Sequence, residues 1–129
     1  MKSLLLDTHA MLWFWWADLR LSSTARSLIE DADNRKLVSV ASCWEIAVKV
    51  GLKKLDIGES SRLFLPREIA RNHFELLPIG LDHATAVEGL AMHHRDPFDR
   101  LLIAQAMVEG LSLVSADGVF DQYDISRLW

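Results

Sequence analysis

Two aspartates directly follow two short apolar segments that lie far apart in the chain. The run at 3–6 leads into Asp7, and the run at 112–115 leads to Asp117. Each run has the length and composition of a buried parallel strand. Ligands of open parallel sheets bind beyond the carboxyl ends of the strands, so we expect these two carboxylates to meet there. Either aspartate alone could be a helix cap or a turn residue, and the pair is therefore more informative than its members.

A glutamate, Glu45, follows another strand candidate, 36–40, in the first turn of a helix expected over 43–55 with Ser42 as its cap. It has an ordinary interpretation, because a carboxylate interacts favourably with a helix N-terminus. It also lies between Trp44 and Ile46 on an otherwise apolar helix, which predicts partial burial. A buried carboxylate needs a partner, so we expect Glu45 to face the same edge of the sheet.

Two further aspartates, Asp96 and Asp99, open a strong helix expected over 98–109. Their spacing places them on one face of the first turn. Asp96 is explained as the N-cap before Pro97. Asp99 is not needed for capping, and it leads the apolar run LLIA, which should pack against the sheet.

Five carboxylates at one edge of a sheet repel one another unless a cation lies between them. Oxygen ligands alone select hard divalent metals, Mg²⁺ or Mn²⁺. The net charge of −4 argues against nucleic-acid binding by phosphate neutralisation alone. A bound cation would let an acidic protein hold a polyanion, and it would lower the pKa of an attacking water. The acids therefore indicate metal-dependent hydrolysis of phosphodiesters.

The elements that must position these acids alternate between strand and helix. Strands are expected at 3–6, 36–40, 76–79, 112–115 and 125–128, with Pro78 marking an edge or an end. Helices are expected at 8–17, from Ser22 or Ser23 to near Asn34, at 43–55 with Trp44, Ala47, Val48 and Leu52 at helical spacing, at 63–74 with Pro66 near the start, at 82–93 capped by Asp82, and at 98–109 closed by Gly110. This alternation predicts an α/β fold, a three-layer α/β/α sandwich with a central, mostly parallel sheet. The 129 residues suit a single domain over 1–129.

Four segments of the chain resemble the acidic motifs of PIN-domain proteins, above all the VapC-type ribonuclease toxins of type II toxin–antitoxin systems. The segments are LLLDTHAMLW, SCWEIAVK, HRDPFDRLLIAQA and LVSADGVFDQY, in the family's order and over nearly the whole chain. By this resemblance Asp7, Glu45, Asp99 and Asp117 occupy the catalytic, metal-binding positions. Asp96 matches an additional metal-site aspartate, Thr8 follows the first acid, and Ser115 precedes the last.

The resemblance also implies an activity and partners. It implies an endoribonuclease that depends on Mg²⁺ or Mn²⁺, forms a homodimer and is neutralised by a cognate antitoxin protein. Two other hypotheses stay open at this point. The protein could be a non-catalytic RNA- or protein-binding module of PIN-like fold, or it could be a phosphatase or DNA nuclease. An enzyme that forms a covalent aspartyl-phosphate is expected to have the motif D-x-D after the first strand, whereas this chain has Asp7-Thr8-His9.

The remaining polar residues carry weaker signals. His73, His83, His93 and His94 show no zinc-site spacing, and we expect them at helix ends and on the surface. Five basic residues could contact phosphate around the acids, although most such residues are simply solvated: Lys49, Lys53, Lys54, Arg95 and Arg100.

Four consecutive aromatic residues, Trp13 to Trp16, cannot all be buried by one helix face. At least one should be exposed or at an interface, which favours a protein partner or a dimer contact. Stacking on RNA bases is the alternative. The single Cys43 fits a reducing compartment, and Asp7 and His9 interrupt the apolar N-terminal run, so we expect a cytoplasmic protein without a signal peptide or membrane span.

Overall fold

A five-stranded, all-parallel sheet forms the centre of the molecule. The computed structural model describes residues 1–129. The strands are β1 (Ser3–Leu6), β2 (Arg35–Ser39), β3 (Glu75–Leu77), β4 (Ser112–Val114) and β5 (Arg127–Leu128), in the spatial order β3-β2-β1-β4-β5. The strand before Pro78 lies at the sheet edge, as expected. The apolar strand β1 lies at the centre, between β2 and β4.

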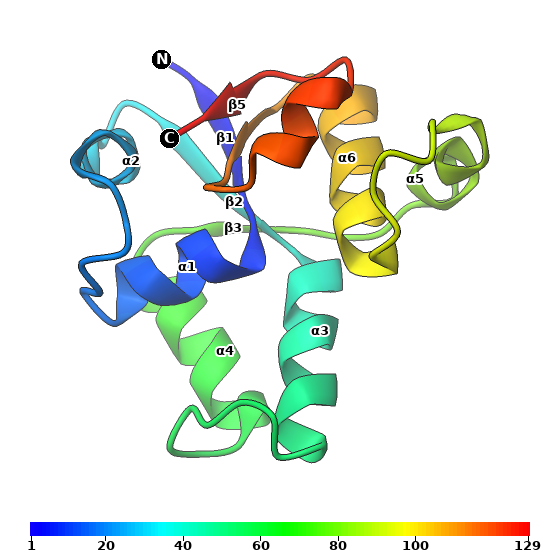
Figure 1. Cartoon of the computed structure of the whole chain (residues 1–129). Helices are drawn as coiled ribbons and strands as arrows, with labels where there is room; N and C mark the ends of the chain where they lie inside the picture. Colours follow the sequence, from blue (N-terminus) through cyan, green and yellow to red (C-terminus); the bar gives the residue numbers. More distant parts are fainter.

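Helices cover both faces of this sheet, so the predicted α/β/α sandwich is confirmed. They are α1 (Thr8–Trp15), α2 (Ser23–Glu30), α3 (Val40–Gly51), α4 (Ser61–Arg71), α5 (Leu81–Ala86) and α6 (Pro97–Glu109), with the 3-10 helices η1 (Val87–Gly89) and η2 (Gly118–Gln122). Successive side chains of a strand point to opposite faces. Leu4 and Leu6 accordingly pack in the core with α1, α2 and α4, whereas Leu5 packs with α6. Figure 1 shows α1 and α2 on one side of the sheet and α6 on the other.

The start of α3 differs from the prediction. Ser39, the last residue of β2, is the N-cap, and its hydroxyl accepts a hydrogen bond from the Ala41 N–H at 3.0 Å. Ser42, the predicted cap, is a buried residue inside the helix. A helix can begin as soon as a capping side chain is available, and the Ser39 hydroxyl comes before that of Ser42 in the chain. Glu45 therefore lies in the second turn of α3, not the first.

The buried face of α3 was also not the one that the apolar spacing indicated. Ile46 is fully buried, whereas Trp44 is 58% and Leu52 60% exposed. The buried side of α3 includes Ser42 and Glu45, so polar residues occupy part of the inner face. An apolar stripe thus remains on the outer face of α3.

Three other helices also differ from the prediction at their ends. The second helix ends at Glu30, and Asn34 lies beyond it, where its side chain bonds to the Leu28 carbonyl and the Lys2 N–H. Pro66 lies in the middle of α4, because this helix already begins at Ser61. The helix expected over 82–93 has Gly80 as its N-cap instead of Asp82, and it ends at Ala86.

Arg100 explains why the chain leaves helical structure after α5. This buried residue donates hydrogen bonds to the carbonyls of Val87, Leu90, Ala91 and His94 at 2.9–3.3 Å. A continuous helix would use these carbonyls internally. Because the guanidinium is buried and occupied, the hypothesis that Arg100 contacts phosphate is wrong.

Replacing Arg100 with lysine is expected to lower the free energy of unfolding by about 2–4 kcal/mol, since an ammonium lacks the planar fork that reaches four carbonyls at once. Urea denaturation measures this change. Arg95→Lys is the matched control, because Arg95 is exposed in the same segment. Equal stability of the two variants would show that the carbonyl contacts contribute little.

No helix of the structure combines the length and the hydropathy that crossing a bilayer requires.

Candidate metal centre

The central strands bring Asp7 and Asp117 to the same edge of the sheet. Leu6 of β1 is in register with Val114 of β4, and the Asp7 N–H donates to the Val114 carbonyl at 3.1 Å. Both aspartates line one pocket of about 130 Å³ at the carboxyl ends of these strands. If the two side chains pointed to opposite sides of the molecule, they could not share a site. In the structure they line the same pocket.

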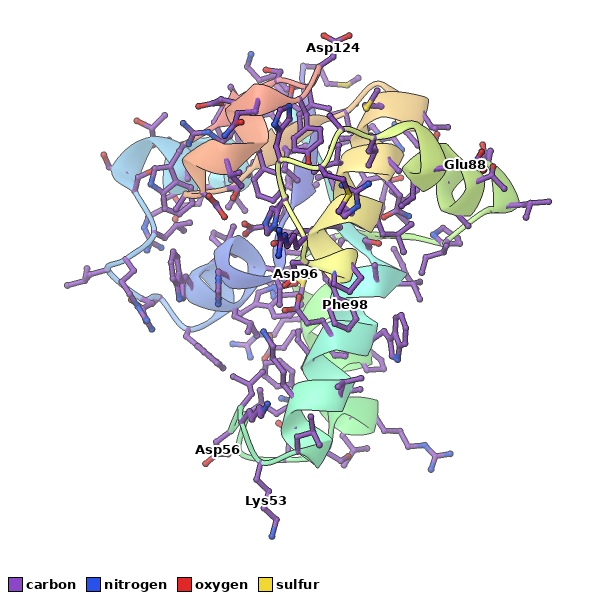
Figure 2. The ribbon with its side chains drawn as sticks, turned by 45° about the vertical axis from the view of Figure 1, so that its right-hand side comes forward. Lys53, Asp56, Glu88, Asp96, Phe98 and Asp124 are labelled. Atoms are coloured by element: carbon purple, nitrogen blue, oxygen red, sulfur yellow. The ribbon has the colours of Figure 1, made fainter.

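The other three acids line the same pocket. They arrive on two further elements, α3 and the start of α6, so four separate parts of the chain meet here. In Figure 2, Asp96 and Phe98 mark the start of α6, above the upper part of α3. The complete lining consists of Asp7, Thr8, His9, Glu45, Lys49, Asp96, Asp99, Asp117 and Phe120.

Asp7 is both a helix cap and a buried acid. Its Oδ1 accepts a hydrogen bond from the Ala10 N–H at 2.8 Å and so caps α1. Burial raises the pKa of this carboxyl above its ordinary value, and the charge of Glu45 adds to the rise. Hydrogen bonds from Ser115 and Ala10 act in the opposite direction. The cap would form equally well with an uncharged residue, so capping alone does not require a carboxylate here.

Glu45 is buried, as expected, and both of its oxygens are bonded. The Thr8 hydroxyl donates to Oε1 at 2.6 Å, and the Lys49 ammonium donates to Oε2 at 2.6 Å. Lys49 lies one helical turn after Glu45, the spacing at which ion pairs form on a helix. These contacts hold Glu45 rigidly, with Lys49 as the one lysine of the pocket lining.

The two aspartates at the start of α6 have different roles, as the sequence predicted. Oδ1 of Asp96 accepts from the Phe98 and Asp99 N–H groups at 2.8 and 3.2 Å, which confirms it as the N-cap. Burial raises the pKa of Asp99 to about 7, and the nearby charge of Asp96 contributes further. The apolar run that follows is buried against the sheet. Asp99 is thus held at the pocket by a helix that cannot easily move.

Two histidines contradict the expectation of surface positions. Nε2 of His94 lies 2.8 Å from Oδ2 of Asp99 and 3.8 Å from Oδ2 of Asp117. His83 is buried on α5, with Nδ1 accepting from the Gly80 N–H and Nε2 lying 2.7 Å from Glu109. For His94, its position two residues before Asp96 was the one indication in the sequence that it lies near the acids. His83 could not be recognised, because its partner lies 26 residues away.

The predicted phosphate-contacting residues are dispersed. Lys49 lines the acidic pocket, whereas Lys53 lies at the far end of α3, well away from Asp96 (Figure 2). The four-aromatic run behaves as predicted: Trp13, Phe14 and Trp15 pack partly buried against the core, and Trp16 is 41% exposed.

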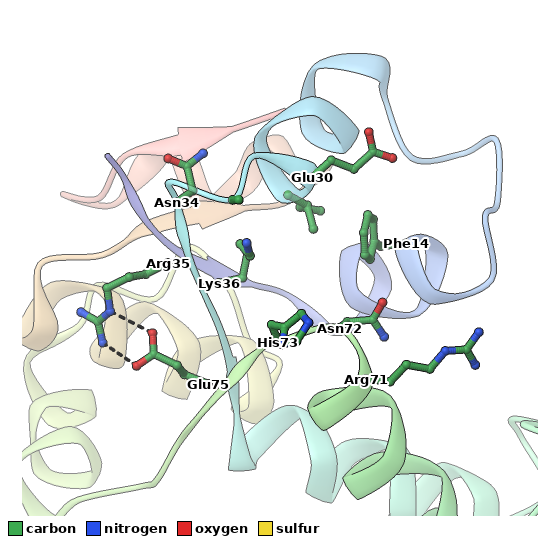
Figure 3. A pocket seen from close by; sticks show the side chains of 11 residues that line it. Phe14, Glu30, Asn34, Arg35, Lys36, Arg71, Asn72, His73 and Glu75 are labelled. Atoms are coloured by element: carbon green, nitrogen blue, oxygen red, sulfur yellow. Dashed lines mark hydrogen bonds and ion pairs between the residues drawn. The ribbon is translucent and has the colours of Figure 1, made fainter.

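A larger pocket of about 570 Å³ lies at the opposite edge of the sheet, between the start of β2 and the end of α4. Figure 3 shows its lining, with Arg35 paired to Glu75 at 2.9 and 3.0 Å. Its other acid is Glu30, so carboxylates do not converge there. The smaller pocket is therefore the better candidate for chemistry.

The acidic pocket fits a divalent cation. Its ligand atoms are predominantly carboxylate oxygens from Asp7, Glu45, Asp96, Asp99 and Asp117, the donors that Mg²⁺ and Mn²⁺ prefer. The pKa values of Asp7 and Asp99 are raised, which shows that the protein alone does not compensate these charges. A hard cation among them would provide that compensation.

Comparison with known proteins adds an independent observation. The model of the PIN domain family matches residues 4–126. Ribonuclease VapC16 of Mycobacterium tuberculosis is 37% identical over 59 residues, which are 46% of this chain; the match spans 40% of that relative's length.

Among solved structures, DNA-bound VapBC from Salmonella typhimurium superimposes with a TM-score of 0.74 at 17% identity, over 99% of this chain and 98% of that chain. VapBC2 from Rickettsia felis, bound to a promoter DNA fragment, gives a TM-score of 0.67 at 15% identity, over 98% of both chains. At these identities the likeness shows a common fold.

Proposed function

Since the chain belongs to the PIN-domain family, we propose that it is an endoribonuclease dependent on Mg²⁺ or Mn²⁺ and the toxin of a toxin–antitoxin pair. The observation that carries this proposal is the convergence of five acids from four parts of the chain in one pocket: Asp7, Glu45, Asp96, Asp99 and Asp117. The name of the relative VapC16, a ribonuclease, supports RNA as the substrate.

The acids would have different roles. Asp7, Asp99 and Asp117 would hold the metal, directly or through water. Glu45 is bonded by Thr8 and Lys49, so it would act at the side of the pocket and through these neighbours. Asp96 commits Oδ1 to the helix cap, and its second oxygen remains for the metal or a bound water.

A bound Mg²⁺ or Mn²⁺ would supply activation of a water nucleophile and stabilisation of the charge that develops on the phosphate. The protein's own groups would orient that reaction. His94 lies against Asp99, with its Nε2 2.8 Å from Oδ2, and would orient this carboxylate. Lys49 is partly exposed beside Glu45, so its ammonium can turn toward a phosphate oxygen.

The proposed partners are an antitoxin and a second copy of the chain, in the cytoplasm. Neighbours of the same fold were solved as VapBC complexes, which supports an antitoxin partner. The exposed apolar side chains of Trp44, on α3, and of Leu52, directly after this helix, supply a face that a homodimer could bury. A small DNA-binding protein encoded beside this chain would support the toxin role.

Incubation with single-stranded RNA and with DNA of the same sequence, each with Mn²⁺, tests the function. We expect new RNA fragments on a denaturing gel and intact DNA. Intact RNA that co-elutes with the protein would favour the non-catalytic binding module instead. Cleavage of DNA but not RNA would identify a DNA nuclease.

A further inference from the structure

His9 is an exposed aromatic ring at the mouth of the acidic pocket. It lies in the first turn of α1, two residues after Asp7, and it lines the pocket with the acids. Its ring nitrogens make none of the side-chain hydrogen bonds or ion pairs that organise Glu45, Asp96 and His94. The proposed reaction leaves this residue without a role.

One face of the His9 ring packs against Trp13. The two rings lie nearly parallel, with centroids 5.3 Å apart and an interplanar angle of 13°. Trp13 is itself fixed, because it is half-buried, meets Trp129 edge-on at 6.0 Å and has the Arg20 guanidinium 5.0 Å from its centroid. The charge of Arg20 is already paired with Asp18 at 2.7 Å. His9 is therefore a flat surface that Trp13 supports on one face.

The electrostatics of the pocket determine which part of an RNA can lie against this surface. The acids repel every phosphate except the one held by the cation. A nucleobase is uncharged, so it can approach the rim of an acidic pocket without this cost. Single-stranded RNA is commonly recognised by stacking of unpaired bases on aromatic side chains, histidine included.

We propose that His9, supported by Trp13, is the stacking platform for one unpaired nucleobase of the RNA next to the scissile phosphate. This inference rests on the proposed ribonuclease function and specifies its substrate class. The base must be free to leave its neighbours, so the preferred substrates are single strands and loops. A base held in a duplex cannot stack on the His9 ring while its phosphate occupies the pocket.

Three substitutions test the platform in cleavage of a short single-stranded RNA with Mn²⁺. His9→Asn removes the ring, and we expect KM to rise by about 5- to 150-fold, the range for loss of one stacked base, with little change in kcat. His9→Phe keeps a flat ring and should restore a KM near that of the wild type. His73→Asn is the matched control, because His73 is exposed at the opposite sheet edge, in a left-handed conformation that asparagine tolerates.

An RNA with one abasic position beside the cleavage site identifies the base that stacks. With His9 present, this RNA should bind as weakly as the intact RNA binds to the His9→Asn variant, and the two changes together should weaken binding no more than either alone. Fluorescence anisotropy in an Asp99→Asn background measures binding while the RNA stays intact.

Two outcomes would overturn the platform alone: an active wild type whose His9→Asn variant keeps its KM, or a His9→Phe variant as impaired as His9→Asn. A wild type that neither binds nor cuts RNA would overturn the proposed function together with the platform.

Discussion

Replacing Asp7 with asparagine is expected to reduce the rate of RNA cleavage by at least about 100-fold, because even partners behind the direct metal ligands are worth about 10- to 100-fold. The substitution removes one negative charge from the pocket and changes little else. Asparagine can accept the same hydrogen bond from the Ala10 N–H, so the cap of α1 is kept. The loss of activity should therefore occur in a folded protein.

The same variant should be as stable as the wild type or more stable when no metal is present. The raised pKa of Asp7 shows that its charged form is disfavoured by burial and by Glu45. Asparagine is free of both costs. Calorimetry measures the Tm, and a fluorescent RNA measures cleavage.

Asp56→Asn is the matched control for Asp7→Asn. Asp56 is an exposed aspartate that also accepts a backbone hydrogen bond, from the Gly58 N–H at 2.8 Å, and it lies far from the pocket (Figure 2). The Asp56→Asn variant should cleave RNA at the wild-type rate. An Asp7→Asn variant that cuts RNA as fast as this control would remove Asp7 from the mechanism, and one that is unfolded would show a structural role instead.

Removing divalent metal with EDTA should abolish cleavage, and adding Mn²⁺ or Mg²⁺ should restore it. Metal at about 100 times its dissociation constant adds about 2.7 kcal/mol to stability. For a domain of this size, that corresponds to a Tm increase of roughly 5–15 °C. The increase is measured by thermal unfolding with and without metal, at matched ionic strength.

The metal effect should grow with pH, because the pKa of Asp99 in the folded protein is about 7, above its ordinary value of 3.8. The folded metal-free protein therefore holds a proton that the unfolded chain has released. This group's contribution to stability is full below pH 4 and is lost as the pH rises through 7. Metal replaces the proton, so the Tm increase should be larger at pH 8 than at pH 6. A Tm that metal leaves unchanged at pH 8 would contradict the site.

Much of the candidate site could be predicted because it depends on simple geometry. Parallel strands end at one edge, so the acids after β1 and β4 had to meet once both runs were identified as strands. Asp96 and Asp99 followed from the cap before Pro97, since a cap and the residue three positions later share the first turn. The periodic run after them placed α6 against the sheet.

The features that could not be predicted depend on competition between hydrogen bonds. Ser39 and Ser42 are equally good caps in sequence, and only the end of β2 decides between them. Arg100 and Lys49 look like two surface cations, yet one binds four carbonyls and the other binds Glu45. His94 became a neighbour of Asp99 and Asp117 through the loop that Arg100 organises. No local pattern shows which partner such a group will choose.

Crystals of the protein soaked in Mn²⁺, with diffraction recorded at the manganese absorption edge, would show whether the acids bind a metal ion. We expect an anomalous peak bonded to at least two of the three carboxylates of Asp7, Asp99 and Asp117. The cluster of Asp82, His83 and Glu109 beside α5 is a built-in comparison, because its groups also lie close enough to hold an ion. A peak at that cluster alone, with none in the acidic pocket, would show that the five acids do not form the metal centre.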